Sequence, residues 1–142
     1  MQYIVPSVAT GLISSAIFAM VRPANIAASM NQRQWPFIAQ KPHINKHCAQ
    51  LSQILSDIDR IGAERLWCAI EALLQFADTQ TNSPMKQAQC AKLLHECKRC
   101  LSRGHTSIRE DCEVDTVVMA EMYLQDLETQ LALVLENFVR GV

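Results

Sequence analysis

The segment HECKRCLSRGHT, residues 95–106, holds the side chains best suited to chemistry: two cysteines spaced C-x-x-C, with histidines on both sides. Zinc in proteins prefers thiolate and imidazole ligands, and a structural site takes about four of them. The candidate ligands here are Cys97, Cys100 and His105. Because no second C-x-x-C or H-x-x-x-H pair follows at the usual spacing, we expect these residues to hold no metal.

His43 and His47 form a separate pair, one helical turn apart. Two histidines at this spacing can bind one metal ion from a single helix. No carboxylate stands at a matching step and no third ligand is evident. We therefore interpret them as surface histidines near a helix start, and we expect the protein to need no cofactor.

Arg99 and His105 lie in the stretch RCLSRGH. This stretch resembles the R-x4-6-H motif of HEPN ribonucleases, a family of small all-helical proteins. In that family the Arg and the His, usually paired across a dimer, position and activate the RNA 2′-hydroxyl and stabilise charge on the phosphate. Cys100 stands where the family commonly has Asn, Asp or His. The resemblance implies RNA cleavage as an alternative function, whereas our main expectation is a protein without a catalytic site.

The composition indicates one helical domain with its own core. The chain has 142 residues, 49% of them hydrophobic, a net charge of −1 and few Gly or Pro residues. These values exclude wholesale disorder and a collagen-like chain. The six cysteines fall within helical patterns rather than in a small loop-rich scaffold, so we expect reduced thiols.

A long amphipathic pattern predicts one helix from about Pro42 to about Thr79. Its apolar positions form one helix face, made by Ile44, Cys48, Leu51, Leu55, Ile58, Leu66, Ala69 and Leu73. The pattern keeps its phase across Gly62, so we expect the helix to continue there at a cost of about 1 kcal/mol.

Two further helices are predicted in the second half of the chain. The first runs from Pro84 to about Ser102 and ends at Gly104. Its core stripe consists of Cys90, Leu94, Cys97 and Leu101. The second opens with Ser107 and Glu110 at capping-box spacing and continues to about Arg140.

The last predicted helix carries an unbroken apolar seam, made by Val117, Ala120, Leu124, Leu127, Leu131, Val134 and Phe138. Alternating steps of three and four are typical of a coiled coil or of a long bundle helix. The sequence thus predicts an all-α fold, a helical bundle of about four helices, two of them long, over residues 42–142. Residues 1–41 are predicted to form an apolar N-terminal helix followed by a linker.

Residues 4–21 form an uncharged stretch that leaves three alternatives open. It can be a buried helix, a membrane anchor or a secretion signal. Our main expectation is a cytoplasmic protein, with a membrane-associated or exported protein as the alternatives. Residues 31–42, NQRQWPFIAQKP, are interpreted as a linker in which Trp35 and Phe37 pack on the bundle or meet a lipid interface.

The charges divide sharply between the last two predicted helices. Six basic residues and one acidic residue lie in 86–109, whereas 110–136 holds eight acidic and no basic residues. These helices either neutralise each other as antiparallel neighbours or present an acidic face to a basic partner. A basic helix without aromatic residues in a near-neutral chain does not indicate nucleic-acid binding.

We therefore expect a non-catalytic protein-interaction module: an adaptor, a chaperone-like accessory factor, a regulator or a subunit of a helical assembly. Helices of this length extend beyond a small domain and leave surface on which another chain can pack, so we expect a homo- or hetero-oligomer. We expect the partner to be another protein, and we favour one with a basic surface. The residues expected to bind it are Glu121, Asp126, Glu128, Glu136, Leu124, Leu131 and Phe138.

Overall fold

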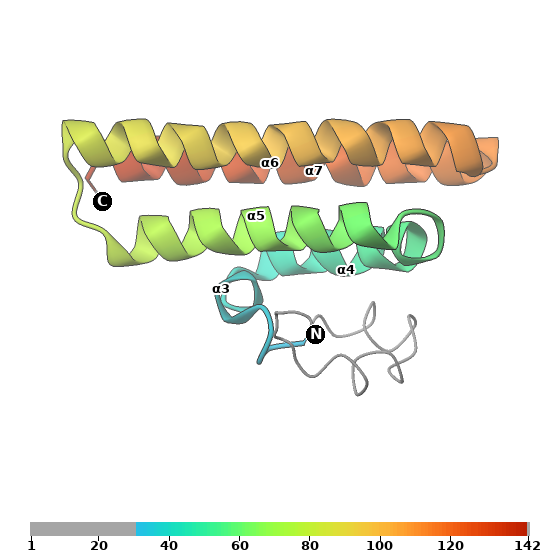
Figure 1. The fold of residues 1–142 in the computed structure, drawn as a ribbon, viewed down its shortest axis with the longest axis horizontal. Coiled ribbons are helices and arrows are strands. Elements are labelled where there is room, and N and C mark those ends of the chain that lie inside the picture. Colours follow the sequence, from blue (N-terminus) through green and yellow to red (C-terminus); the bar gives the residue numbers. More distant parts are fainter. Residues whose placement is uncertain (1–30, 142) are drawn as a thin grey trace.

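The computed structural model describes residues 31–141, and within that range the protein has helices and no strands. The helices are α3 (Pro36–Ala39), α4 (Pro42–Ile58), α5 (Arg60–Thr79), α6 (Pro84–Asp111) and α7 (Val114–Val139). The four longer ones run alternately up and down. Figure 1 shows α4 beside α5 in one layer and α6 beside α7 in a second layer. The predicted all-α helical bundle is confirmed.

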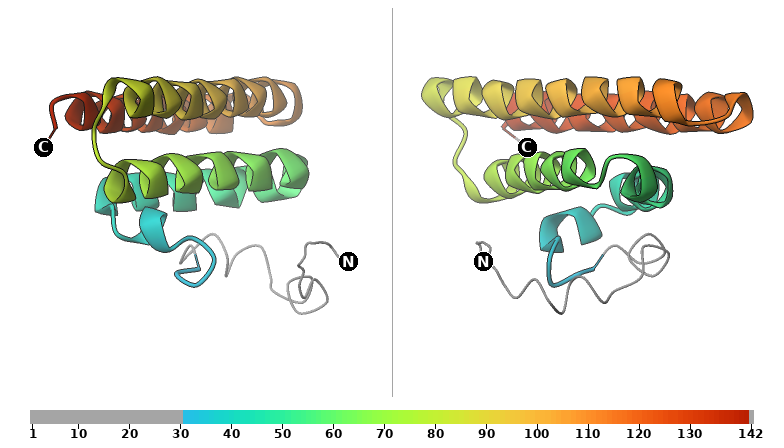
Figure 2. Two further views of the ribbon diagram at one scale, coloured as in Figure 1. Left: turned by 60° about the vertical axis from the view of Figure 1, so that its left-hand side comes forward. Right: turned by 45° about the vertical axis from the view of Figure 1, so that its right-hand side comes forward.

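The short helix α3 lies on the side of the α4–α5 layer that faces away from α6 and α7 (Figure 2). Trp35 and Ile38 are buried in the core, and Phe37 packs against it. The Glu71 carboxylate of α5 accepts the backbone N–H groups of Phe37 and Ile38 at 2.8 and 2.9 Å. Much of the predicted linker is therefore fixed to the bundle by burial and by two charge-assisted hydrogen bonds.

The apolar stretch 4–21, with its predicted N-terminal helix, lies outside the described residues. Within residues 31–141, no helix combines the length and the apolar character needed to cross a bilayer.

The prediction of one continuous helix from 42 to 79 is wrong. The chain turns at Asp59, whose φ of −155° and ψ of 72° are not helical, and α5 returns beside α4. Asp59 Oδ1 accepts the Gly62 N–H at 3.1 Å, so this side chain caps the new helix. A cap of this kind satisfies a first-turn donor that a continuous helix would not leave free.

The predicted stop at Gly104 and the predicted capping box at Ser107 are also wrong. Helix α6 continues through both residues to Asp111, and α7 begins only at Val114. Gly104 is buried in the helix, facing Leu55 and Leu124. Gly141, which follows α7, is the glycine in the left-handed region among the described residues, with φ of 73°. Packing, and not local propensity, therefore decides the course of the chain at Gly104.

The core contains both stripes that the sequence predicts. Cys90, Leu94, Cys97 and Leu101 are all buried. Of the seam on α7, five members are buried and Val117 and Val134 are partly buried. Leu124, Leu131 and Phe138 are 1%, 0% and 6% exposed, so they pack in the core of the bundle. They present little surface to the partner that they were expected to bind. The coiled-coil geometry of the seam stays a prediction.

Candidate functional site

The cysteines of the C-x-x-C spacing lie in the core of the bundle. Cys97 is fully buried, and Cys100 is 9% exposed. Burial raises the pKa of the Cys97 thiol to about 12, which keeps it protonated and a poor metal ligand. His105 instead places Nδ1 3.3 Å from Glu121 Oε2. Among residues 31–141, no three His, Cys, Asp or Glu side chains converge as metal ligands would.

The two histidines of α4 do not share a site either. His47 Nδ1 lies 2.5 Å from the backbone carbonyl oxygen of His43, and its Nε2 lies 3.4 Å from Asp126 Oδ2 on α7. Both ring nitrogens of His47 thus face oxygen atoms of the chain. The ring of Tyr123 lies edge-on to the His47 ring, with 6.3 Å between the two ring centroids. His47 therefore acts as a contact between α4 and α7.

Arg99 and His105 are not brought together for catalysis. Arg99 binds Glu96 of its own helix through Nε and Nη2, at 3.2 and 2.6 Å. His105 pairs with Glu121 of α7. Because α6 continues through Gly104, residues six apart point about 120° away from each other around the helix axis. The geometry provides no support for a shared ribonuclease site on one chain.

The outward face of α7 is rich in apolar side chains. Six of the eight exposed large hydrophobic residues in the described range belong to this helix. Four of them cluster in its first half, and we name them the α7 patch: Val114, Val118, Met119 and Met122, which are 76%, 59%, 47% and 60% exposed. The outward side of the neighbouring helix α6 is polar, with Lys92, Lys98 and Arg99 all exposed. An apolar cluster on one helix is a feature that marks interaction surfaces.

Carboxylates surround the α7 patch. Asp115, Asp126 and Glu128 are exposed, and Glu121 is half-buried on the α6 side. Arg109 Nε lies 2.6 Å from Glu121 Oε2, and this hydrogen bond holds the pKa of Glu121 below its ordinary value. The predicted neutralisation between α6 and α7 thus occurs at Glu121, whereas Glu136 pairs with Arg140 of the same chain end.

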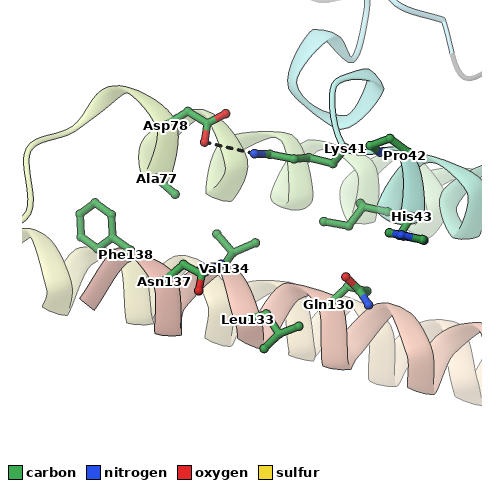
Figure 3. Close-up of a pocket in the computed structure, with 11 residues that line it drawn as sticks. Lys41, Pro42, His43, Ala77, Asp78, Gln130, Leu133, Val134, Asn137 and Phe138 are labelled. Carbon is green, nitrogen blue, oxygen red and sulfur yellow. Dashed lines mark ion pairs between the residues drawn. The ribbon is translucent and has the colours of Figure 1, made fainter. Parts of the chain in front are cut away.

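A notch of about 440 Å³ opens between the first turn of α4, the last turn of α5 and the C-terminal half of α7 (Figure 3). Its polar lining residues are Lys41, His43, Asp78, Gln130 and Asn137. Its apolar wall includes Ile44, Ala77, Val134 and Phe138. Sequence reasoning missed this site because residues almost a hundred positions apart form it. The sequence predicts other roles for several lining residues: His43 belongs to a histidine pair, and Ile44, Val134 and Phe138 belong to apolar stripes.

The fold is that of a four-helix up-and-down bundle with a short helix added to one layer. Searches with protein-family models, of curated proteins and of solved structures each find no significant match.

Proposed function

We propose that this bundle is a non-catalytic protein-interaction module and that it docks its partner on the α7 patch and the surrounding carboxylates. One observation carries the proposal: exposed apolar side chains gather on a helix whose exposed charged residues are all acidic. Burying such side chains against a partner gains about 25 cal/mol for each Å² of apolar surface. No comparable gain is available on the polar face of α6.

The charges around the patch specify the kind of partner. If two α7 patches faced each other, Asp115, Asp126 and Glu128 would meet carboxylates of the second copy, and like charges at close range oppose association. A basic amphipathic helix would instead place its apolar side on Val118 and Met122 and its Lys or Arg residues over the carboxylates. We therefore favour a hetero-complex with a basic protein over a symmetric dimer through this face.

A pair of methionine variants tests the docking face. Met122 is 60% exposed in the α7 patch, and Met85 is 70% exposed at the start of α6, outside it. Proteins captured from the native cell by the tagged wild-type chain are compared with those captured by Met122→Lys and by Met85→Lys. We expect a specific partner to be lost with Met122→Lys only, because the new charge would face a basic surface. An unchanged set of captured proteins with Met122→Lys contradicts the proposal.

The salt dependence of the interaction provides a second test. Association steered by exposed carboxylates slows as ionic strength rises, because the Debye length falls from about 10 Å at 0.1 M to about 3 Å at 1 M. We expect the association rate with the captured partner to fall with added NaCl, and to fall less in Asp126→Asn/Glu128→Gln. Identical salt dependence in both chains would contradict the acidic part of the face.

The location of the protein belongs to the same proposal. We propose a cytoplasmic module, with membrane association or export through residues 4–21 as the alternatives. Deleting residues 1–22 and fractionating the native cell tests the cytoplasmic module against the membrane anchor. Equal distribution of the full chain and the truncated chain supports the cytoplasmic module, and a shift of the truncated chain out of the membrane fraction supports an anchor.

A further inference from the structure

At this end of the bundle α4 begins further inward than the ends of α5 and α7, and the notch lies next to its first turn. The first turn of α4 stands at one end, Phe138 of α7 and Ala77 of α5 at the other, and Val134 between them (Figure 3). The rings of Phe138 and Phe76 pack with their centroids 5.9 Å apart, and this contact holds Phe138 at the apolar end of the notch. The volume of about 440 Å³ falls in the range of small-molecule sites, which is roughly 300–1,000 Å³. The notch is separate from the α7 patch, which occupies the opposite half of that helix.

The polar groups of the notch differ between its two ends. Lys41 reaches across it, with Nζ 3.6 Å from Asp78 Oδ1, so the negative charge lining the notch has a cationic partner. The first turn of α4 has no side-chain cap and no acidic residue. Its free N–H groups and the positive end of the helix dipole favour an anion. His43 and Gln130 add hydrogen-bonding groups at this same end (Figure 3).

We propose that the notch binds a small amphipathic carboxylate. Its head group lies against the first turn of α4, between Lys41 and Gln130, and its hydrocarbon body lies on Val134 and Phe138. A ligand cation would have to displace Lys41 from Asp78, whereas an anion adds a second partner to Lys41. An apolar body without a head group would leave the donors of the α4 turn unpaired, so it should bind more weakly than a carboxylate.

Titration of the full-length protein with octanoate tests this site, with octan-1-ol and octylammonium as probes of the same chain length. We expect saturable one-to-one binding of octanoate in isothermal titration calorimetry, at least about tenfold tighter than either other probe. In NMR spectra of the wild-type chain, the backbone amides of Ile44 and Val134 should shift during the titration. No saturable binding, equal binding of octan-1-ol, or shifts confined to other helices would each overturn the proposal.

A notch-filling variant provides the matched comparison. Ala77 lines the notch, and Ala91 is exposed on α6 away from it. Ala77→Phe should weaken octanoate binding at least about tenfold, whereas Ala91→Phe should leave it unchanged. Equal binding by the two variants would overturn the proposal. If Ala77→Phe does not fold, as judged by its circular dichroism, the wild-type amide shifts decide the question alone.

Discussion

Gly62 lies in the first turn of α5 and Gly104 in the second half of α6, and different atoms surround them. A Cβ added at Gly62 would overlap the Asp59 carboxylate and would come within 2.9 Å of Arg103 Nε. A Cβ added at Gly104 would meet Leu55 at 3.7 Å and Leu124 at 3.9 Å, which is ordinary packing distance. A polar network therefore needs the first glycine, whereas an apolar helix contact merely accommodates the second.

The network at Gly62 is built around one carboxylate. Asp59 accepts hydrogen bonds from the Gly62 N–H at 3.1 Å, from Arg103 Nε and Nη2 at 2.9 and 3.1 Å, and from the Ser107 hydroxyl at 3.1 Å. It thus joins the α4–α5 turn to α6. The break between α4 and α5 therefore depends on the side chain at 59, and the glycine only leaves room for it.

Removing that carboxylate should have the largest effect. We expect Asp59→Ala to lower the free energy of unfolding by about 2 kcal/mol, since it removes a helix cap worth about 1 kcal/mol together with charge-assisted bonds to α6. Urea denaturation measures the loss. Asp57→Ala, at an exposed position two residues earlier, is the control and should change stability by less than about 0.5 kcal/mol. Equal losses in the two variants would contradict the role of the network.

The pH dependence of stability should follow the same carboxylate. The Arg103 hydrogen bonds hold the pKa of Asp59 below its ordinary value, with help from the Gly62 N–H and Ser107. A lowered pKa in the folded state gives stability that is complete above the unfolded value of about 3.9 and is lost as pH falls through the folded value. Asp59→Asn should therefore lose less stability than the wild type on acidification. Parallel curves of unfolding free energy against pH would contradict this assignment.

The two glycines also show what the sequence could and could not predict. Periodicity correctly placed Cys90, Cys97 and Leu124 in the core, because burial of a helix face depends on spacing that the sequence displays directly. Both glycines were predicted wrongly: periodicity kept the helix continuous at Gly62, and the local glycine signal ended a helix at Gly104. The contacts that decide are with Asp59 and with Arg103 of α6 at Gly62, and with Leu55 of α4 and Leu124 of α7 at Gly104.

The candidate sites divide in the same way. Val114, Val118 and Met122 follow one another at steps of four, opposite the predicted seam, so the α7 patch could have been found from the sequence. The notch could not, because its formation depends on where α4 begins relative to the ends of α5 and α7.

Substitution at Gly62, alone and together with substitution at Asp59, tests whether the two positions interact. We expect Gly62→Ala alone to destabilise the protein by about 1 kcal/mol, since the displaced cap costs more than the improved helix propensity gains. In the Asp59→Ala background the overlap with the carboxylate is gone, and Arg103, which is no longer bound to it, can move its flexible side chain away from the new methyl group. The same substitution should then stabilise by up to about 1 kcal/mol. Urea denaturation of the four chains gives this cycle. Additive effects would show that the two positions do not interact.

The smallest expected effect is at Gly104, and its sign is opposite. The residue is helical and its neighbours leave space for a methyl group, so Gly104→Ala should raise the free energy of unfolding by about 0.5–1 kcal/mol. Much of the gain comes from the unfolded chain, which loses conformational freedom, and contacts with Leu55 and Leu124 add to it. Ala91→Gly, at an exposed position of the same helix, should lower stability by a similar amount. Destabilisation by Gly104→Ala would mean that α4 and α7 approach α6 too closely there to admit a side chain, and Gly104 would then resemble Gly62 in being required.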